Sequence, residues 1–372
     1  MMRRTRMLSL NDREWKTFTV EDIFKVSSGK RLETRNKVDG NRPFVGASFN
    51  GNGITGFVGN DNVSRDRNVL GVSYNGAPCV AFYHPYECLF TDDVKRLHLK
   101  NYPDNEKVLL FFVAIFAQQR EKYSYGYKFN AERMLRQKIM LPVNDSGDPD
   151  WQFMEDYMRE RDAIQLRCLQ AFLNKRIAGI ERVTAEHVDV SEAKWDAFVV
   201  GDICDVDSGR DIYAAERIVG NMPYVTAGTV NNGIGYFVGN DNETKTTGAI
   251  SVSRNGANVG RAFYHPYEAL YGNDCRRLTV KGNDSPYVSL FLTQCIASQR
   301  NAFSYSRKLG TARLKQLKVM LPASETGEPD YELMENYMRG VTLKHYKRLL
   351  KYTTDIAETP PSDNPRQRIA DR

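Results

Sequence analysis

The sequence lacks the features that would place it in several large classes of protein. Among its 372 residues are only six cysteines and no Cys-x-x-Cys pair, which argues against a disulfide framework and a zinc ribbon. No apolar run approaches the roughly 18 residues that a membrane-spanning helix needs. The basic N-terminal stretch has no apolar segment of about 7 to 15 residues, as a secretory signal would have. We therefore expect a cytoplasmic protein with reduced cysteines.

Signatures of common enzymes are also missing. There is no Gly-x-Ser-x-Gly, no His-Glu-x-x-His, no Walker loop and no Asn/Asp-Pro-Pro-aromatic loop of the kind that amino-methyltransferases use. Pro149-Asp150 and Pro329-Asp330 resemble the start of a nuclease Pro-Asp…Glu-x-Lys motif, but no Glu-x-Lys follows either pair. Each Asp stands where a helix should begin, so helix capping explains it better than metal binding does. We predict no catalytic residue and no metal site in this chain.

What the sequence does contain is a long internal repeat. Trp-Gln-Phe-Met-Glu-Asp-Tyr-Met-Arg, which begins at Trp151, returns as Tyr-Glu-Leu-Met-Glu-Asn-Tyr-Met-Arg at Tyr331, an offset of 180 residues. A one-residue insertion makes the offset 181 for a stretch, where residues 82–87 match residues 263–268. Self-similarity at so long a period indicates a tandem pair of domains, each followed by a helix.

The predicted fold is mixed α/β, with two repeated globular domains separated by a pair of long antiparallel helices that form a coiled-coil spacer. Apolar residues at helical spacing run from Met154 to Phe172 and from Met334 to Ile356. Helices of ~40 to 45 Å, at ~1.5 Å per residue, exceed what one small domain covers, so each stripe should bury the other. The predicted segments are a flexible arm (1–12), the first globular domain (13–145), the first long helix with its linker (146–190), the second globular domain (191–325), the second long helix (326–358) and a disordered tail (359–372).

The globular domains should be rich in short strands. Asn-Gly at 52–53 and at 232–233 separates apolar stretches, which predicts β-hairpins. The glycines have the wrong spacing, and no helix follows them, for a nucleotide-binding loop. His84 lies between Cys79 and Cys88, but the second repeat has no cysteine at either place, so a structural histidine is favoured over a metal ligand.

A Ser-Gly-basic turn occurs in both repeats, at residues 28–30 and 208–210. Such a turn could present backbone N–H groups and a cation to a phosphate, or it could be an ordinary glycine turn with a solvated basic residue. The net charge of +6 and the isoelectric point near 8.8 are compatible with an anionic partner but do not identify one.

Two further stretches combine a shared framework with different side chains. Ser-Tyr-Asn-Gly-Ala at 73–77 corresponds to Ser-Arg-Asn-Gly-Ala at 253–257. The loops at 123–130 and 303–310 both interleave aromatic and basic residues. Cations in such loops can contact phosphates while the rings stack on bases, or the rings can simply pack on the domain. We favour binding, because the pattern occurs twice.

The order of these motifs resembles that of the specificity (S) subunits of type I restriction-modification systems. The individual motifs are similar to those of the related subunits that direct type IIB enzymes. They are Trp-x-x-Phe…Asp-Ile, Asn-Gly-Ile, Phe-Tyr-His-Pro-Tyr and Leu-Pro…Pro-Asp-aromatic…Met-Glu-x-Tyr-Met, each present twice between about Trp15 and Glu358. The resemblance implies a non-catalytic subunit with two target recognition domains, each reading one half of a bipartite DNA sequence. It also implies that the helix pair docks methyltransferase or fused methyltransferase-nuclease subunits, which would carry S-adenosylmethionine and Mg²⁺, with no cofactor in this chain.

Two unlike half-sites are expected, because the repeats differ in the side chains that could face DNA. Arg254 is the leading candidate for a base contact, since arginine bonds O6 and N7 of guanine together. Asn75 and Asn255 could read adenine or could serve the Asn-Gly turn. The full set of predicted DNA-binding residues is Lys30, Arg31, Tyr74, Asn75, Tyr125, Lys128, Arg210, Arg254, Asn255, Arg307 and Lys308. The alternatives are a stand-alone DNA-modifying or DNA-cleaving enzyme and a tandem β-rich module that binds protein or carbohydrate.

Overall fold

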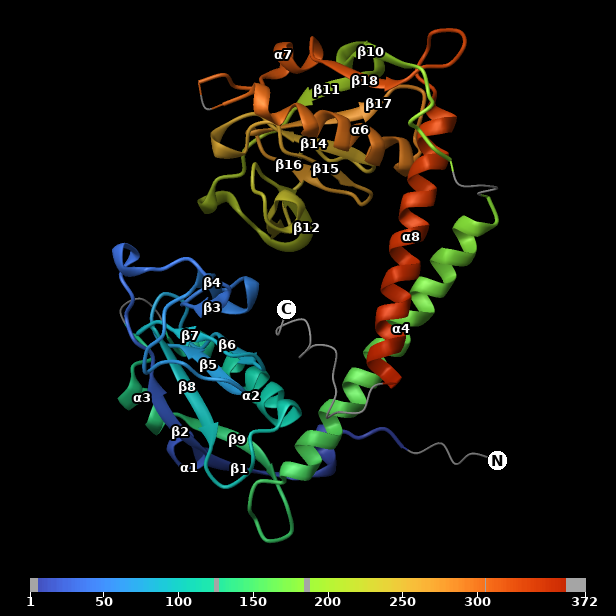
Figure 1. Cartoon of the computed structure of the whole chain (residues 1–372). Coiled ribbons are helices and arrows are strands. Elements are labelled where there is room, and N and C mark those ends of the chain that lie inside the picture. Colours follow the sequence, from blue (N-terminus) through green and yellow to red (C-terminus); the bar gives the residue numbers. More distant parts are fainter. Residues whose placement is uncertain (1–5, 124–126, 184–187, 305, 359–372) are drawn as a thin grey trace, which may run out of the picture. The chain divides into compact units, whose positions relative to one another are not determined.

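The computed structural model describes residues 6–123, 127–183, 188–304 and 306–358 (Figure 1). It divides into two compact units, Met1–Phe172 with Lys351–Arg372, and Leu173–Leu350. Both units contain the same order of strands and helices, which confirms the tandem repeat. The tail predicted to be disordered, 359–372, lies outside the described residues. No helix in the described ranges is both long enough and apolar enough to cross a membrane.

The first unit is a mixed α/β domain made mainly of short antiparallel strands. Its strands are β1 (Glu14–Thr19), β2 (Phe24–Ser28), β3 (Arg42–Val45), β4 (Ile54–Val58), β5 (Val69–Ser73), β6 (Ala81–His84), β7 (Leu89–Phe90), β8 (Val94–Leu99) and β9 (Lys138–Val143). Its helices are α1 (Val20–Ile23), α2 (Glu106–Gln118), α3 (Ala131–Arg136) and most of α4 (Trp151–Glu181). The sheets have the strand orders β2-β8-β5-β6, β4-β3-β7 and β1-β9, and only the β3–β7 pairing is parallel among those of this unit.

The second unit repeats this architecture. Its strands are β10 (Trp195–Val199), β11 (Cys204–Ser208), β12 (Val219–Val225), β13 (Ile234–Val238), β14 (Ala249–Ser253), β15 (Ala262–His265), β16 (Leu270–Tyr271), β17 (Cys275–Val280) and β18 (Lys318–Pro322). Its helices are α5 (Val200–Ile203), α6 (Pro286–Ser298), α7 (Thr311–Lys315) and most of α8 (Tyr331–Glu358). The sheet orders are β11-β17-β14-β15, β13-β12-β16 and β10-β18, equivalent to those of the first unit.

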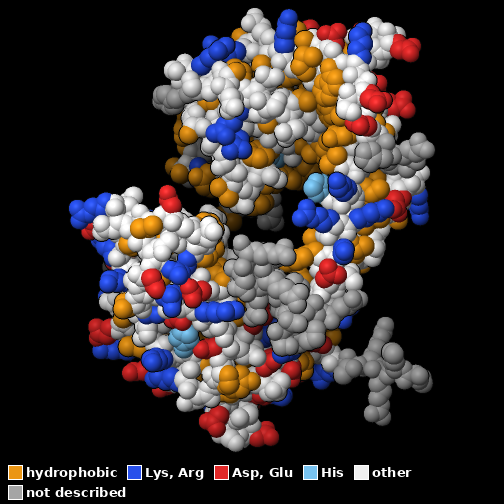
Figure 2. Space-filling view, in the orientation of Figure 1, with side chains coloured by type: hydrophobic (Ala, Val, Ile, Leu, Met, Phe, Trp, Pro, Cys, Tyr) orange, Lys and Arg blue, Asp and Glu red, His pale blue; other side chains and the backbone are white. Residues whose placement is uncertain are grey.

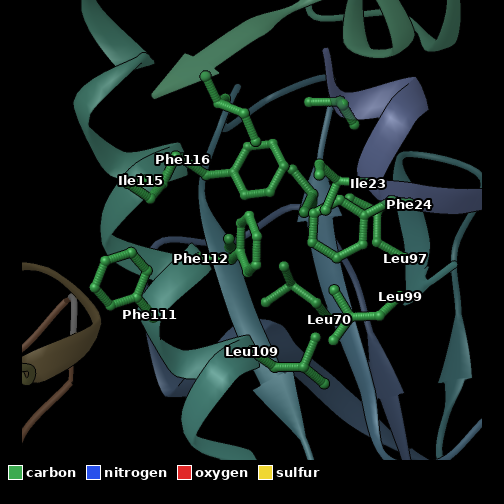
Figure 3. Packing of buried hydrophobic residues seen from close by; sticks show 14 of the residues in the cluster. Ile23, Phe24, Leu70, Leu97, Leu99, Leu109, Phe111, Phe112, Ile115 and Phe116 are labelled. Atoms are coloured by element: carbon green, nitrogen blue, oxygen red, sulfur yellow. The ribbon is translucent and has the colours of Figure 1, made fainter. Parts of the chain in front are cut away.

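A four-stranded sheet and one apolar helix form the core of the first unit. β5 is buried throughout, as expected of an apolar strand that lies between two others. Helix α2 points Phe112 and Phe116 toward Phe24 and Leu97 of the sheet (Figure 3). The rings of Phe24 and Phe112 meet edge to face with their centroids 4.7 Å apart. This packing fixes the end of β5, from which a candidate DNA-binding turn emerges.

The predicted role of the two Pro-Asp pairs in capping is confirmed. Asp150 Oδ1 accepts the backbone N–H of Phe153 at 2.9 Å, and Asp330 Oδ1 accepts that of Leu333 at the same distance. A carboxylate at this position satisfies an otherwise unpaired N–H at the start of a helix and interacts favourably with the helix dipole. These aspartates therefore start the two long helices.

Part of the segment expected to be a loose arm is ordered. Leu10–Asp12 forms a short 3-10 helix capped by Ser9, and the indole N–H of Trp15 donates to the carbonyl of Leu10 at 2.8 Å. The backbone N–H of Leu8 donates to Glu160 of α4, also at 2.8 Å. A loose arm does not describe residues 8–12, because Leu8 bonds α4 and Ser9 caps the 3-10 helix, whereas the boundary of the arm stays a prediction.

The side chains that are buried on α4 differ from those that the apolar stripe predicts. α4 spans 31 residues and α8 spans 28. Leu173 and Ile177 of α4 are buried, whereas Phe172 is 54% exposed. The predicted stripe included both Phe172 and Leu173, because local periodicity does not distinguish two neighbouring apolar positions. α4 therefore carries at Phe172 an apolar side chain that the described residues leave largely uncovered.

The Asn-Gly motifs lie in the predicted hairpins, though not as two-residue turns. β3 pairs antiparallel with β4, which confirms the hairpin in the first unit. Asn52 has φ of 53° and Gly53 has φ of 74°, the left-handed region that Asn and Gly tolerate. The connection is nevertheless longer than two residues, since it ends in a 3-10 turn, Gly51–Gly53.

His84 has structural contacts. It is fully buried, its ring meets that of Phe90 edge to face at 5.3 Å, and Nδ1 lies 3.3 Å from the hydroxyl of Tyr86. Burial lowers the pKa of His84 to about 4, so the ring is neutral at pH 7. The predicted structural role is confirmed.

A charged cluster around His98 occurs only in the first unit, because Thr279 stands at the equivalent place in the second. His98 Nδ1 lies 2.7 Å from Asp104, and Nε2 lies 3.1 Å from Asp66, which also bonds Arg96 at 2.9 Å. Hydrogen bonds to Asp104 and Asp66 raise the pKa of His98 to about 9, against the opposing effect of burial. The folded domain therefore binds a proton more tightly than the unfolded chain does.

This cluster predicts a loss of stability at alkaline pH. A group whose pKa is raised on folding stabilises fully below its unfolded pKa of about 6.5, and that contribution disappears as pH rises through about 9. We expect the difference in unfolding free energy between the wild type and His98→Thr to shrink by about 1 to 2 kcal/mol between pH 6 and pH 9.5, allowing for partial solvent screening. Denaturant titrations at both pH values measure it, and a difference that grows with pH would contradict the prediction.

Candidate nucleic-acid interface

Three loops meet at one end of the four-stranded sheet in each unit. We term them the loop cluster, which comprises residues 46–53, 74–80 and 119–130 in the first unit and 226–233, 254–260 and 299–310 in the second, apart from 124–126 and 305. In the first unit, a methyl group added at Gly76 would lie 3.3 Å from Cβ of Ala47. The guanidinium of Arg120 lies 4.3 Å from the ring centroid of Phe49. Stretches far apart in the sequence therefore share one surface.

Direct hydrogen bonds join the same loops in the second unit. Asn258 Nδ2 donates to the carbonyl of Ala227 at 2.9 Å. The backbone N–H of Leu309 donates to the carbonyl of Arg254 at 3.1 Å. The strand-end turn and the aromatic-basic loop, which the sequence singled out separately, thus belong to one site.

The asparagines of the strand-end turns are tied to aspartates. Asn75 Nδ2 donates to Asp93 Oδ1 at 2.9 Å, and Asn255 Nδ2 donates to Asp274 Oδ1 at 3.3 Å. A bidentate contact with adenine uses both the oxygen and the NH2 group of the side chain, so each asparagine would have to give up this bond. The contacts support the turn role, and the adenine contact stays a prediction.

Tyr74 lies over a buried cation that sequence reasoning missed. Lys95 Nζ is 4.7 Å from the ring centroid of Tyr74 and donates to Ser28 Oγ at 2.9 Å. Burial lowers the pKa of Lys95, while the charges of Asp92 and Asp93 oppose this effect. The Ser-Gly-basic turn and the strand-end turn are thereby connected through one side chain. The sequence did offer one signal for Lys95: a basic residue stands at this place in both repeats, because Arg276 is the counterpart of Lys95.

In the second unit, two guanidinium groups are neighbours. Arg276 is buried, and its Nη1 donates to the carbonyls of Asn273 and Cys275, each at 2.9 Å. Burial and the nearby charge of Arg254 both lower the pKa of Arg276. Arg254 Nε lies 3.7 Å from Asp274 Oδ1, which is beyond hydrogen-bonding distance. Nε of Arg254 has no hydrogen-bond partner among the described residues.

The Ser-Gly-basic turns do not form phosphate cradles. The backbone N–H of Lys30 donates to the carbonyl of Phe90 at 2.9 Å, and that of Arg210 donates to the carbonyl of Tyr271 at 2.8 Å. Of the two alternatives, these bonds favour the ordinary glycine turn, because carbonyl groups of β7 and β16 already accept the N–H groups of Lys30 and Arg210. The side chains of Lys30 and Arg31 are exposed, and Arg210 forms a solvent-exposed ion pair with Glu243 at 3.0 Å. A pair so exposed is weak because water screens it, and Arg210 could exchange Glu243 for a phosphate.

The aromatic-basic loops combine packing with exposed groups. Phe129 is buried in the first unit, as is Leu309 in the second. Tyr127 is half exposed and stacks on Tyr123 with their centroids 5.7 Å apart. The backbone carbonyl of Lys128 accepts from Arg133 at 2.8 Å. One apolar residue thus anchors the loop, while its neighbours face outward.

Other predicted contacts of these loops are placed as follows. Tyr125 lies outside the described residues. Lys128 is half buried, whereas Arg307 and Lys308 are exposed. The backbone N–H of Arg307 donates to the carbonyl of Ser304 at 3.0 Å, which closes a tight turn and leaves the side chain outside. Whether any of these side chains contacts DNA stays a prediction.

Overall charge does not locate the interface. On the visible face of each unit, Lys and Arg side chains are interspersed with Asp and Glu (Figure 2). The net charge of +6 is spread over 52 basic and 46 acidic residues. The loop cluster is therefore identified by convergence of the repeated motifs, not by a basic patch.

Comparison with known proteins gives three findings. A family model for the type I restriction modification DNA specificity domain matches residues 12–169 and 192–351. The type II restriction enzyme BgcI specificity subunit S.BcgI of Heyndrickxia coagulans is 53% identical over 150 residues, which are 40% of this chain and 44% of that protein, so less than half of the relative is matched. Solved structures with similar chains include the type I restriction-modification S subunit from M. genitalium (TM-score 0.46, 17% identity, covering 94% of this chain and 96% of that one) and the HsdS subunit from Thermoanaerobacter tengcongensis (TM-score 0.31, 11% identity, covering 93% and 92%).

Proposed function

Because the chain belongs to the family of type I restriction-modification DNA specificity domains, we propose that it is the non-catalytic specificity subunit of a restriction-modification complex. Residues 13–145 and 191–325 act as two target recognition domains. Each reads one half of a bipartite, asymmetric DNA site. The observation that carries this proposal is the loop cluster, which has the same backbone framework in both units and different side chains at its surface.

The shared framework and the differing side chains have separate consequences. Tyr74 and Arg254 both follow the last residue of a buried strand, and both backbone N–H groups bond the carbonyl of an aspartate, Asp93 at 3.0 Å and Asp274 at 2.9 Å. Two equivalent turns can approach DNA in the same way. A tyrosine and an arginine offer different groups to the bases, so the half-sites differ.

The two long helices act as an antiparallel spacer. In the second unit, Glu181 of α4 pairs with Lys347 of α8, with Oε1 and Nζ 2.6 Å apart. In the first unit, Leu166 of α4 and Ile356 of α8 line the same cleft of about 810 Å³. The later residue of α4, Glu181, thus lies near the earlier residue of α8, Lys347, and Leu166 lies across the cleft from Ile356. This order supports antiparallel pairing. The length of these helices would fix the gap between half-sites.

The spacer also docks the partner subunits. Leu169 and Phe172 of α4 are exposed apolar side chains three residues apart on a long helix. Neighbouring exposed apolar residues favour a protein partner. The partner is a methyltransferase or a fused methyltransferase-nuclease, which supplies S-adenosylmethionine and Mg²⁺. DNA phosphates are contacted by exposed basic residues such as Lys30 and Arg31.

The test is to co-express the chain with the methyltransferase of its own system and to sequence the DNA for modified bases. A split motif of two unlike half-sites around a constant gap is the expected result. The purified chain alone, given S-adenosylmethionine or Mg²⁺, should neither methylate nor cleave DNA. Modification at a continuous motif by a stable complex, or activity of the chain alone, would overturn the proposal.

A further inference from the structure

Three cations of the loop cluster and its surroundings are retained in both units. Each occupies the same element in the two repeats, namely the second residue of β8 and β17, the 3-10 helices that follow α2 and α6, and the helices α3 and α7. The equivalent pairs are Lys95 and Arg276, Arg120 and Arg300, and Arg133 and Arg313. Each of these positions carries a cation in both units, and we term the six residues the platform cations.

In the first unit, an aromatic ring covers each of these cations. The ring centroids lie between 4.1 and 4.7 Å from the charged groups. The pairs are Tyr74 with Lys95, Phe49 with Arg120, and Tyr127 with Arg133. A ring at this distance attracts the cation through its electron-rich face. Tyr127 also stacks on Tyr123, so the part of each ring that a ligand could reach is its solvent-exposed part. Phe49 and Tyr127 are each about half exposed.

In the second unit, no aromatic residue stands at the three equivalent positions, which are Thr229, Arg254 and Arg307. Backbone carbonyls accept from two of the platform cations here: Arg300 Nη2 donates to Ala257 at 3.4 Å, and Arg313 donates to Lys308, as Arg133 does to Lys128 in the first unit. Two of the three rings are thus replaced by further cations. A hollow of about 340 Å³, lined partly by Ala257 and Arg300, lies in this loop cluster.

The two surfaces suit different base edges. Rings present apolar faces, which can pack on the methyl group of thymine or stack on a base. Guanidinium groups present paired donors, which match O6 and N7 of guanine in the major groove. Nε of Arg254 and Nε of Arg276 are buried without a hydrogen-bond partner among the described residues, and so is Nε of Arg96 in the first unit. The second unit differs in that Arg254, whose side chain is 30% exposed, and the exposed Arg307 stand where the first unit has rings.

We propose that residues 49, 74 and 127 in the first unit, and 229, 254 and 307 in the second, determine which bases each half-site contains, while the platform cations position them. The second half-site contains guanine opposite Arg254 or Arg307. The first is read through apolar and stacking contacts. This inference rests on the proposed function and assigns base selection to three positions per unit.

A graft tests the inference in the complete complex with its methyltransferase. Phe49→Thr, Tyr74→Arg and Tyr127→Arg together give the first unit the side chains of the second. Sequencing of modified bases should show that modification at the original first half-site falls at least tenfold, that guanine appears at one or more of its positions, and that the second half-site and the gap are unchanged. The matched control is Phe57→Thr with Val63→Arg, which changes exposed residues outside the loop cluster and should leave both half-sites intact.

The possible outcomes separate the inference from the proposed function. A wild-type complex without a bipartite motif defeats both. A bipartite wild-type motif that the graft leaves unaltered defeats only the assignment of the three positions. If the grafted unit fails to fold, the reciprocal graft of Thr229→Phe, Arg254→Tyr and Arg307→Tyr decides the matter, because it must change the second half-site and not the first.

Discussion

Alanine in place of Gly29 is expected to prevent the first unit from folding, and Gly209→Ala should do the same to the second. An added Cβ at Gly29 would lie 1.9 Å from the carbonyl oxygen of Thr91, and one at Gly209 would lie 2.1 Å from that of Gly272. Both obstacles are backbone atoms next to paired strands, so neither can rotate away. The cost should exceed about 3 kcal/mol, against a typical domain stability of about 5 to 15 kcal/mol.

Thermal and denaturant unfolding of the full chain measure this effect. Each substitution should remove or shift the transition of its own unit and leave the other in place. The matched control is Gly56→Ala, since no atom lies within 4 Å of the position where its methyl group would be; it should change the unfolding free energy by less than about 1 kcal/mol. A Gly29→Ala protein as stable as this control would show that the two backbone segments do not approach so closely.

Arg254→Ala is expected to weaken binding of the second half-site by about 10- to 100-fold, and to relax the base preference at one position of that half-site. A bidentate arginine–guanine contact contributes about 1 to 3 kcal/mol of discrimination. Arg254 is suited to this contact because its side chain is 30% exposed and its nearest carboxylate oxygen is 3.7 Å from Nε. The first half-site should be read as before.

Competition with DNA duplexes that vary one base of either half-site measures the preference of the complex. Lys30→Ala provides the comparison, because a lost phosphate contact weakens binding to all sequences alike and lowers the slope of log affinity against log salt concentration by about one. Equal loss on every duplex for Arg254→Ala would show that Arg254 contacts only the DNA backbone.

Local sequence patterns predicted the parts of the fold that depend on near neighbours. Asp150 and Asp330 cap their helices as expected, because the cap involves residues only three positions apart. The repeat itself predicted two similar domains, since it needs no knowledge of contacts. The sequence left two alternatives open for the Ser-Gly-basic turn, because the acceptors of its N–H groups, including Phe90, lie about sixty residues further along.

Tertiary contacts explain the site residues that the sequence did not indicate. Lys95 reads as an ordinary charged residue in an alternating strand, and its burial under Tyr74 arises only when β8 pairs with both β2 and β5. The burial of Arg276 could not be predicted for the same reason, because β17 pairs with both β11 and β14. The choice between Phe172 and Leu173 as a buried residue of α4 likewise depends on the packed partner, which helical periodicity alone does not specify.

The division of the two units within α4 and α8 also bears on the order of synthesis. Residues 351–358 belong to the first unit although they follow the second globular domain and most of α8 in the chain. While the polypeptide emerges from the ribosome, the core around Phe112 can form early. The cleft that Ile356 and Ala357 help to line cannot be completed until the second repeat has been translated. The N-terminal unit is therefore the first to begin folding and among the last parts to be finished.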